Sequence, residues 1–242
     1  MLAPAPRQCT GRRASTRGGR PHPKEEDVSP PPWQPAHVEA VNAGSPAEYE
    51  WLGRTVSTAI FKHPVSGRVA VSGVNLTGDD QADRTVHGGE DKAIYAYAAE
   101  DTRWWENELG RPLLPAAFGE NLTTHGIDLS GTLVGERWRV GSATLEVRQP
   151  RLPCFKLGLR MGDRHFPRRF AAAARPGAYL RIVDEGELGA GDVIEVLSRP
   201  AHDVTVGLIA RAYFCDQSLA PRLLAAPALP ESWVEWARER LR

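Results

Sequence analysis

The stretch Thr132–Val147, TLVGERWRVGSATLEV, carries the clearest fold signal of the chain. It contains two short segments, Thr132–Val140 and Ala143–Val147, which are separated only by Gly141 and Ser142. A two-residue connection that contains glycine is typical of a β-hairpin. Further short strands are predicted where brief apolar runs are bounded by Gly or Pro, at residues 37–41, Thr55–Ile60, Arg68–Val71, Ile94–Tyr97, Ala178–Val183 and Asp192–Leu197. Strands of this length and spacing predict a mainly β fold, either a barrel or a sandwich.

Turn residues predict a second hairpin, because PVSG at Pro64–Gly67 lies between the runs Thr55–Ile60 and Arg68–Val71. Two helices are expected to interrupt the strands. Ala99–Leu109 starts with acidic residues, which the helix dipole favours, and it stops at a glycine. Phe166–Ala174 places two phenylalanines four residues apart on one helical face.

The pattern becomes helical after residue 200. Three helices are predicted there, at Val204–Phe214, Gln217–Ala226 and Ser232–Leu241, and the last is clearly amphipathic. We therefore expect a β-barrel domain over residues 37–200 and a small three-helix C-terminal domain over residues 201–242.

The composition narrows the class of protein. The chain has 242 residues, with 30 Lys+Arg against 30 Asp+Glu, so its formal net charge is zero and bulk attraction to nucleic acid is not expected. Its three cysteines contain no CxxC pair, which argues against a disulfide scaffold or a Cys-rich zinc site. No apolar run approaches the roughly 18–20 residues of a membrane helix, so a cytoplasmic globular protein without a membrane partner is expected.

The first 36 residues differ from the rest of the chain. They hold eight of the twenty prolines and six of the thirty Lys+Arg residues, with almost no large aliphatic side chains. Such a segment buries too little apolar surface to offset the entropy of ordering its backbone. A disordered tail without a function of its own is the interpretation that the composition favours.

The polar segment Gly78–Lys92, GDDQADRTVHGGEDK, is dense in titratable groups. Asp79, Asp83 and His87 are spaced four apart and would share one face of a helix, as metal ligands sometimes do. However, the segment is rich in glycine and lacks an apolar stripe, so a loop is the better prediction. In a loop, the backbone N–H groups around its glycines and the side chain of Lys92 can bind an anion.

The segment Gln149–Leu157, QPRLPCFKL, sets Cys154 between two cations, Arg151 and Lys156. Nearby cations favour the thiolate, which is both a nucleophile and a ligand for soft metals. With His87 and Asn121 as partners, a Cys-His hydrolase is also conceivable. The segment by itself leaves an inert buried cysteine, a hydrolase and a metal ligand all open.

Two further segments have weaker signals. Phe118–Leu122, FGENL, contains a glycine that allows close approach of a ligand and an asparagine that offers both donors and an acceptor. Phe61–Arg68, FKHPVSGR, places Lys62 and Arg68 on either side of a turn.

The ordered set of these motifs resembles the MOSC domain family and, within it, the YiiM-like proteins. The motifs are KxPVxGxV, GDxQADxxVHGGxDKAxYxY, FGENL, QPRxPCxKL and GDxIEVL, at Lys62–Val69, Gly78–Tyr97, Phe118–Leu122, Gln149–Leu157 and Gly191–Leu197. The resemblance extends over residues 37–242. It implies a MOSC β-barrel that binds the molybdenum cofactor in its molybdopterin form. Because the YiiM-like group also resembles the mitochondrial amidoxime-reducing component, it implies an oxidoreductase that reduces N-hydroxylated compounds, including hydroxylaminopurine bases, to amines.

The resemblance also implies roles for individual residues. Cys154 is expected to ligate molybdenum and to be catalytic, with His87 or Asp91 as a proton donor. The expected cofactor-binding residues are Lys62, Arg68, His87, Gly88, Gly89, Lys92, Gly119, Glu120, Asn121, Arg151 and Lys156. A separate reductase protein is expected to deliver electrons.

Other hypotheses remain open at this point. MOSC domains also occur at the end of molybdenum-cofactor sulfurases, so a cofactor carrier or sulfur-transfer module without its own turnover is the alternative to a reductase; the pyridoxal-phosphate domain of those enzymes is absent from this sequence. DNA binding by Ser232–Leu241 is disfavoured because its arginines are balanced by glutamates. A homodimer built on the helical end is one arrangement that the sequence allows.

Overall fold

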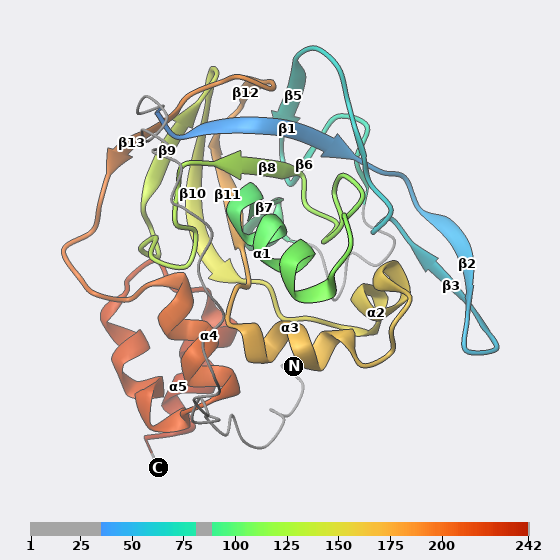
Figure 1. Cartoon of the computed structure of the whole chain (residues 1–242). Coiled ribbons are helices and arrows are strands. Elements are labelled where there is room, and N and C mark those ends of the chain that lie inside the picture. The colour runs from blue at the N-terminus through green and yellow to red at the C-terminus, as the bar shows by residue number, and fades with distance from the viewer. Residues whose placement is uncertain (1–34, 81–88, 242) are drawn as a thin grey trace, which may run out of the picture.

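The computed structural model describes residues 35–80 and 89–241, which form a curved sheet with helices packed along one side of it (Figure 1). The predicted tail lies outside the described residues except for its last two positions. Within the described ranges, no helix is long and apolar enough to cross a bilayer.

An eight-stranded sheet forms the centre of the molecule. Its strands follow the order β13-β9-β10-β11-β7-β8-β1-β4. They are β1 (His37–Ala43), β4 (His63–Pro64), β7 (Ile94–Ala98), β8 (Leu122–His125), β9 (Arg137–Val140), β10 (Ala143–Pro150), β11 (Ala178–Asp184) and β13 (Ile194–Ser198). Most neighbours are antiparallel, but β7 and β8 are parallel because the helix α1 (Ala99–Leu109) carries the chain back between them.

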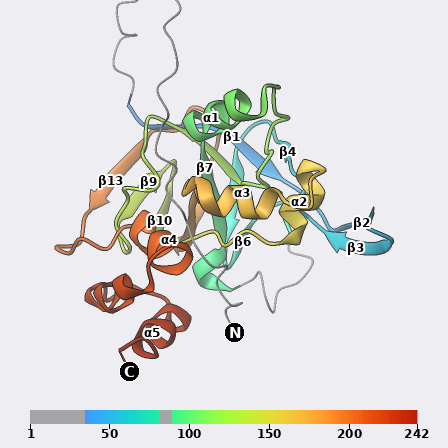
Figure 2. The ribbon, with the colours of Figure 1, turned by 60° about the horizontal axis from the view of Figure 1, so that its bottom comes forward.

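Two smaller sheets flank the large one. β12 (Gly186–Leu188), β5 (Val69–Ser72) and β6 (Asn75–Leu76) form a three-stranded sheet. β2 (Ala47–Trp51) and β3 (Arg54–Thr58) form a hairpin that projects from the body of the molecule (Figures 1 and 2).

The large sheet curls, but its paired strands do not form a closed ring within the described residues, so the predicted closed barrel is not observed. The two sides of the sheet nevertheless meet at the start of β1. There, the N–H of Ile194 donates to the carbonyl of Ala36 at 2.7 Å, and the N–H of Val38 donates to the carbonyl of Asp192 at 2.9 Å. These bonds satisfy backbone groups that an open sheet would leave to water.

The strand predictions were confirmed where the turn was short. The Gly141-Ser142 hairpin is present, with Ala143 opposite Val140. The hairpin predicted around Pro64–Gly67 was wrong, because β3 pairs with β2 and β5 pairs with β12 and β6. The Gly-rich segment after β11 also contains a strand of its own, β12.

Strand β7, IYAYA, is buried on both faces. Ile94, Ala96 and Ala98 face the apolar core inside the curled sheet. Tyr95 and Tyr97 face an aromatic cluster between the sheet and the helices, where Tyr97 stacks on Phe118 at 4.1 Å between ring centroids. Helix α1 extends over Ala99–Leu109 as predicted and ends at Gly110, whose φ of 64° is the left-handed conformation of a helix end.

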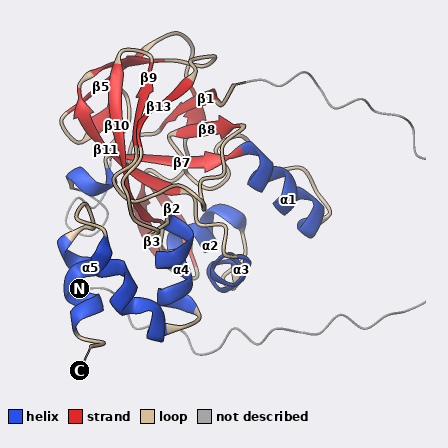
Figure 3. Cartoon of the chain, turned by 90° about the vertical axis from the view of Figure 1, so that its left-hand side faces the viewer, coloured by secondary structure: helices blue, strands red, loops and turns tan. Residues whose placement is uncertain are grey.

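Two further helices lie side by side (Figure 3), and both contribute residues to this aromatic cluster. Helix α3 (Phe166–Ala173) agrees with the prediction, and its Phe166 and Phe170 both pack into the cluster. Helix α2 (Phe155–Met161) was not predicted. It begins directly after Cys154, and Gly158 within it approaches the carbonyl of Asp163 so closely that a Cβ would lie 3.0 Å from that oxygen.

The C-terminal segment is helical near the three predicted positions, but the middle element is a 3-10 helix and a separate three-helix domain is not confirmed. It contains α4 (Val206–Phe214), the 3-10 segment η2 (Gln217–Ala225) and α5 (Glu231–Arg238). Pro221 lies inside η2, where it lacks the N–H that an α-helix would need. These elements pack around Tyr213, Trp233 and Trp236, and their cluster includes residue Val134 of the strand region.

A hydrogen bond ties α5 to the sheet. The indole N–H of Trp233 donates to Oε1 of Gln149 at 2.8 Å, and both residues are buried. We predict that Trp233→Phe lowers the free energy of unfolding by about 1–3 kcal/mol, because a buried amide oxygen loses its donor. Urea denaturation measures this change. Trp236→Phe is the matched control, since it removes a ring of the same size from the same cluster; an equal loss in both variants would contradict the prediction.

Candidate functional site

A pocket lies where the end of β3, strand β7 and the segments around Gly119 and Cys154 meet. It brings together parts of the chain that are up to 121 residues apart, from Thr58 to Tyr179. Its described lining residues are Thr58, Ala59, Ile60, Lys62, Asp79, Asp80, Lys92, Tyr95, Gly119, Asn121, Arg151, Cys154, Lys156 and Tyr179.

Cys154 supplies the thiol of this pocket. It directly precedes α2 in an extended conformation, is half-buried, and is not part of a disulfide. No group of three or more His, Cys, Asp or Glu residues suited to a metal occurs in residues 35–80 and 89–241. The described part of the protein therefore offers a soft metal a single thiolate donor at this position.

Arg151 is a buried cation behind the thiol. Its guanidinium donates to the carbonyl of Phe118 and lies 4.9 Å from the centre of the Tyr95 ring. A planar guanidinium held on an aromatic face keeps one orientation, and its remaining donors can bind an anion.

Lys62 and Asp79 form a buried ion pair at the edge of the pocket. Burial lowers the pKa of Lys62, and Asp79 counteracts this effect. The carboxylate of Asp79 also accepts hydrogen bonds from the N–H of Gly44 and the side-chain amide of Asn121, both at 2.9 Å. Lys62 is thus fixed by a carboxylate that is itself fixed.

Asn121 connects three walls of the pocket. Its backbone N–H donates to the carbonyl of Tyr95 at 2.7 Å, and its side-chain oxygen accepts from the N–H of Tyr95 at 3.1 Å. Its own carbonyl accepts from the N–H of Asn42 at 2.7 Å. Strands β1 and β7 and the residue Asp79 are therefore held together through one side chain and its backbone.

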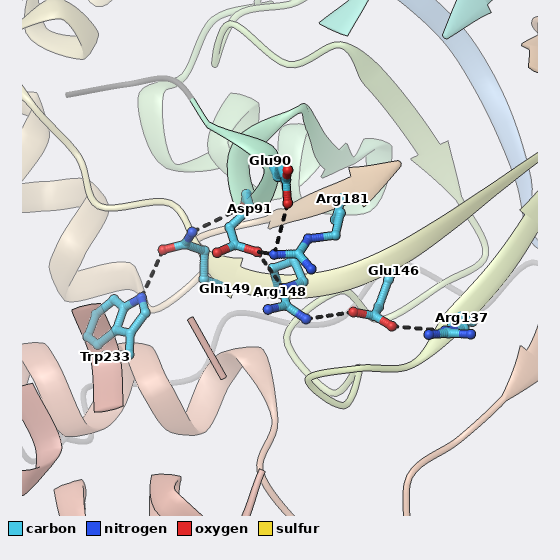
Figure 4. A network of polar contacts seen from close by, with 8 residues as sticks. All are labelled: Glu90, Asp91, Arg137, Glu146, Arg148, Gln149, Arg181 and Trp233. Atoms are coloured by element: carbon cyan, nitrogen blue, oxygen red, sulfur yellow. Dashed lines mark hydrogen bonds and ion pairs between the residues drawn. The ribbon is translucent and has the colours of Figure 1, made fainter. Parts of the chain in front are cut away.

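Lys92 enters the pocket from the short 3-10 helix η1 (Glu90–Lys92), and burial lowers its pKa. This turn is anchored through Asp91, whose Oδ1 accepts from Arg148 and Arg181, both at 2.7 Å (Figure 4). The side-chain amide of Gln149 donates to the Asp91 carbonyl at 3.1 Å. Arg148 and Gln149 of β10 therefore hold both the side chain and the backbone of Asp91.

The pocket carries more positive than negative side chains. Among the described lining residues, Lys62, Lys92, Arg151 and Lys156 face two carboxylates, Asp79 and Asp80. One thiol beside such a cationic surface suits an anionic ligand that contains a soft metal.

Comparison with known proteins shows which family the chain is similar to. A family model described as MOSC domain matches residues 83–195. The "Protein YiiM" of Escherichia coli (strain K12) is 33% identical over 189 residues, which cover 76% of this chain and 84% of that protein. The "Uncharacterized protein YflK" of Bacillus subtilis (strain 168) is 37% identical over 199 residues, covering 81% of this chain and 90% of that protein.

The chain belongs to the MOSC domain family. The crystal structure of YiiM from Geobacillus stearothermophilus has a TM-score of 0.71 at 30% identity and covers 86% of this chain and all of its own. The chain is therefore a YiiM-like MOSC protein. A protein named "Reductase" from Gibberella moniliformis is 30% identical over 89% of this chain, which spans only 39% of that longer protein.

The structure brings most of the predicted site residues of this MOSC protein to one place. Those that line the pocket are Lys62, Lys92, Gly119, Asn121, Arg151, Cys154 and Lys156. Asp91 and Glu120 are sequence neighbours of lining residues, and the carbonyl of Gly89 accepts from the N–H of Lys92 at 3.0 Å, but none of the three lines the pocket. Arg68 lies elsewhere, directly before β5, and its guanidinium donates to the carbonyl of Glu187 in β12 and pairs with Asp192 at 3.1 Å. His87, Gly88 and Asp83 lie outside the described residues.

Sequence reasoning considered Asp79 only as a metal ligand and missed six further lining residues, which are Thr58, Ala59, Ile60, Asp80, Tyr95 and Tyr179. Tyr95 and Tyr179 lie on strands whose alternation was visible, but alternation alone does not show which face carries the site. Asp79 serves instead as the acceptor that holds Lys62 and Asn121.

Gly119 lets two segments approach closely. A Cβ there would lie 2.7 Å from Cγ1 of Ile60, and its φ is +70°. We predict that Gly119→Ala lowers the free energy of unfolding by about 2–4 kcal/mol, from overpacking and backbone strain together. Gly110→Ala is the control, because Gly110 has a φ of +64° but no atom within 4 Å of its Cβ position. Equal losses in urea denaturation would show that the contact with Ile60 contributes nothing.

Glu120 is buried below the pocket, and burial raises the pKa of its carboxyl despite hydrogen bonds from the N–H of Phe118 and the hydroxyl of Thr123. A raised pKa favours the protonated form, so stability falls as the pH rises through the pKa of the folded state. We predict that the free energy of unfolding of Glu120→Gln, relative to that of the wild type, is higher at pH 8 than at pH 5. Urea denaturation at both values measures it, with the exposed Glu235→Gln as control; a difference that does not change with pH would contradict the prediction.

Proposed function

We propose that this MOSC protein binds the molybdenum cofactor and reduces N-hydroxylated compounds, such as hydroxylaminopurine bases, to amines. The observation that carries the proposal is the half-buried thiol of Cys154 in a pocket whose other prominent groups are cations. The printed name of the Gibberella moniliformis relative, "Reductase", supports the reaction class.

The residues present fit the cofactor. A pterin dithiolene that carries molybdenum and a phosphate is anionic and contains a soft metal, so it needs cations, hydrogen-bond donors and a soft ligand. Cys154 would hold the metal, and Arg151, Lys92 and Lys156 would bind the anionic groups. The missing side chain at Gly119 makes room for Ile60, so both residues can line the same wall of the pocket.

The cofactor supplies two-electron chemistry when it is bound. The overall reaction takes R–NHOH, two electrons and two protons to R–NH2 and water, so the N–O bond breaks. The chain itself binds and orients the reactants and keeps the cationic groups in place. A separate reductase protein is proposed as the source of the electrons.

Proton delivery is the second task of the chain. Of the two predicted donors, Asp91 is bound by two arginines outside the pocket lining, and His87 lies beyond the described residues. Tyr179 lines the pocket, and burial raises the pKa of its hydroxyl, so this group keeps its proton at neutral pH.

Replacement of the thiol tests the proposal. We predict that Cys154→Ser, made in a cofactor-competent host, retains less than a tenth of the wild-type molybdenum and of the reduction of 6-hydroxylaminopurine, since an alcohol is a poor ligand for a soft metal. Metal analysis and an amine-release assay measure both. Cys215→Ser is the matched control, because Cys215 is exposed and lies outside the pocket lining.

Two results would overturn the assignment. Full metal content and turnover in Cys154→Ser would remove Cys154 as the ligand. Wild-type protein that contains molybdenum and pterin but releases no amine from any N-hydroxylated compound would favour the cofactor carrier or sulfur-transfer module instead.

A further inference from the structure

A second hollow adjoins the pocket of Cys154. It lies between the β2–β3 hairpin and the start of α2 and has a volume of about 650 Å³. Cavities that bind small molecules typically measure about 300–1,000 Å³. Of the residues that line this hollow, only Lys156 also belongs to the proposed cofactor site.

The hollow has aromatic and aliphatic walls. Trp51, Leu52 and Val56 line the hairpin side, and Phe155 lines the helix side. Leu52 is 68% exposed and Phe155 is 54% exposed, which is unusual for side chains of this size. Two apolar surfaces that face each other across an open space suit a flat apolar ring.

The hairpin turn is built against its local preference. Leu52 and Gly53 connect β2 to β3, and both have positive φ values, 51° and 75°. Turns of this kind favour Asn or Asp at the first position, and leucine rarely adopts the left-handed conformation. Leu52 is 68% exposed and therefore gains little from packing within the chain, so contact with a ligand explains its presence better.

The position of the hairpin relative to α2 is fixed. Tyr49 of β2 stacks on Phe61 with ring centroids 4.0 Å apart, and Arg160 of α2 lies 5.0 Å from the centre of the Phe61 ring. The hollow is therefore bounded by parts that do not have to rearrange when a ligand enters.

The hollow is continuous with the candidate site. Lys156 lines both, and strand β3 extends from Ser57 in the hollow to Thr58 in the pocket. Cys154 and Phe155 are consecutive residues, one in each. A molecule whose reacting group lies at the thiol can thus place its remainder between the hairpin and Phe155.

We propose that this hollow binds the aromatic ring of the substrate and makes the protein selective for planar aromatic N-hydroxylated compounds over aliphatic ones. The inference rests on the proposed function, because the reacting N–OH group is assigned to the Cys154 pocket. Leu52 and Phe155 are specificity-determining residues in this arrangement, and Arg54 and Lys156 border the ring with positive charge.

The test compares 6-hydroxylaminopurine with N-methylhydroxylamine in the loaded protein, using a small artificial reductant so that no protein donor is present. Leu52→Asn and Phe155→Ala are expected to lower kcat/KM for the purine about tenfold and to leave that for N-methylhydroxylamine unchanged. Asn suits the turn, so the first variant keeps the hairpin. Leu114→Asn is the matched control, since Leu114 is 71% exposed and lies outside the hollow.

A binding measurement separates this inference from the proposed function. Calorimetric titration with adenine is expected to show binding to the wild type and about tenfold weaker binding to both variants. If the wild type reduces neither compound, the proposed function fails, and the adenine titration still decides whether the hollow binds a ring.

Three results would overturn the inference. One is a change of equal size in kcat/KM for both substrates, or no change for either substrate. This is also the result expected if the hollow only docks the electron donor. Another is adenine binding that is absent or the same in all proteins. The third is a change in molecular mass by light scattering in either variant, which would assign the hollow to contact between two copies of the chain.

Discussion

The hydrogen bonds of Asn121 are the constraint on which the site depends. Through its backbone and side chain, this residue bonds to Tyr95, Asn42 and Asp79, and Asp79 in turn holds Lys62. The short amide side chain donates to a carboxylate through its nitrogen and accepts from a backbone N–H through its oxygen, so it reaches two partners at once. A carboxylate at position 121 would repel Asp79, and an apolar residue would leave its partners unsatisfied in a buried place. The position of the strands around the pocket and the position of its charges therefore depend on the same group.

Buried charges are arranged in two sets with different tasks. Arg148, Asp91 and Glu146 are paired with one another and with neighbouring arginines beside η1, where each carboxylate has a cation within 3 Å (Figure 4). The charges of this set neutralise one another, and the pairs with Asp91 hold the η1 turn in place. In the pocket, by contrast, Arg151 bonds to a carbonyl and an aromatic face, and no carboxylate within residues 35–80 and 89–241 forms an ion pair with it. Burying a cation without an ion pair is unfavourable. An anionic ligand bound beside Arg151 would compensate for this unfavourable burial.

The sequence predicted those elements whose signals are local. The hairpin at Gly141-Ser142 and the helix Ala99–Leu109 were confirmed because a two-residue turn and a glycine at the helix end each specify their geometry within a few residues. The hairpin around Pro64–Gly67 was wrong because the partner of β3 is β2, whose turn carries leucine instead of a typical turn residue. Helix α2 was hidden by the adjacent Pro153 and by Gly158.

The site was predicted only in part, because each of its motifs is local in the sequence but their arrangement in space is not. The segments around Cys154, Gly119 and Lys92 were recognised as separate motifs, and the resemblance to the MOSC family joined them. Composition and periodicity do not show that Arg68 lies with Asp192 while Lys62, six residues earlier, lies in the pocket. That difference arises from the separate pairing of β4 with β1 and of β5 with β12, which is a long-range choice.

The C-terminal helices are joined to the site by one chain of hydrogen bonds. Trp233 of α5 holds the side chain of Gln149, and Gln149 holds the carbonyl of Asp91 in the turn that carries Lys92 (Figure 4). The Gln149 amide accepts from Trp233 and donates to Asp91, so the positions of these two residues constrain each other. The helical end is thus more than an appendage on the sheet, because its packing limits where a cation of the pocket can lie. Since η1 contains only three residues, it has little internal structure of its own and depends on these external bonds for its conformation.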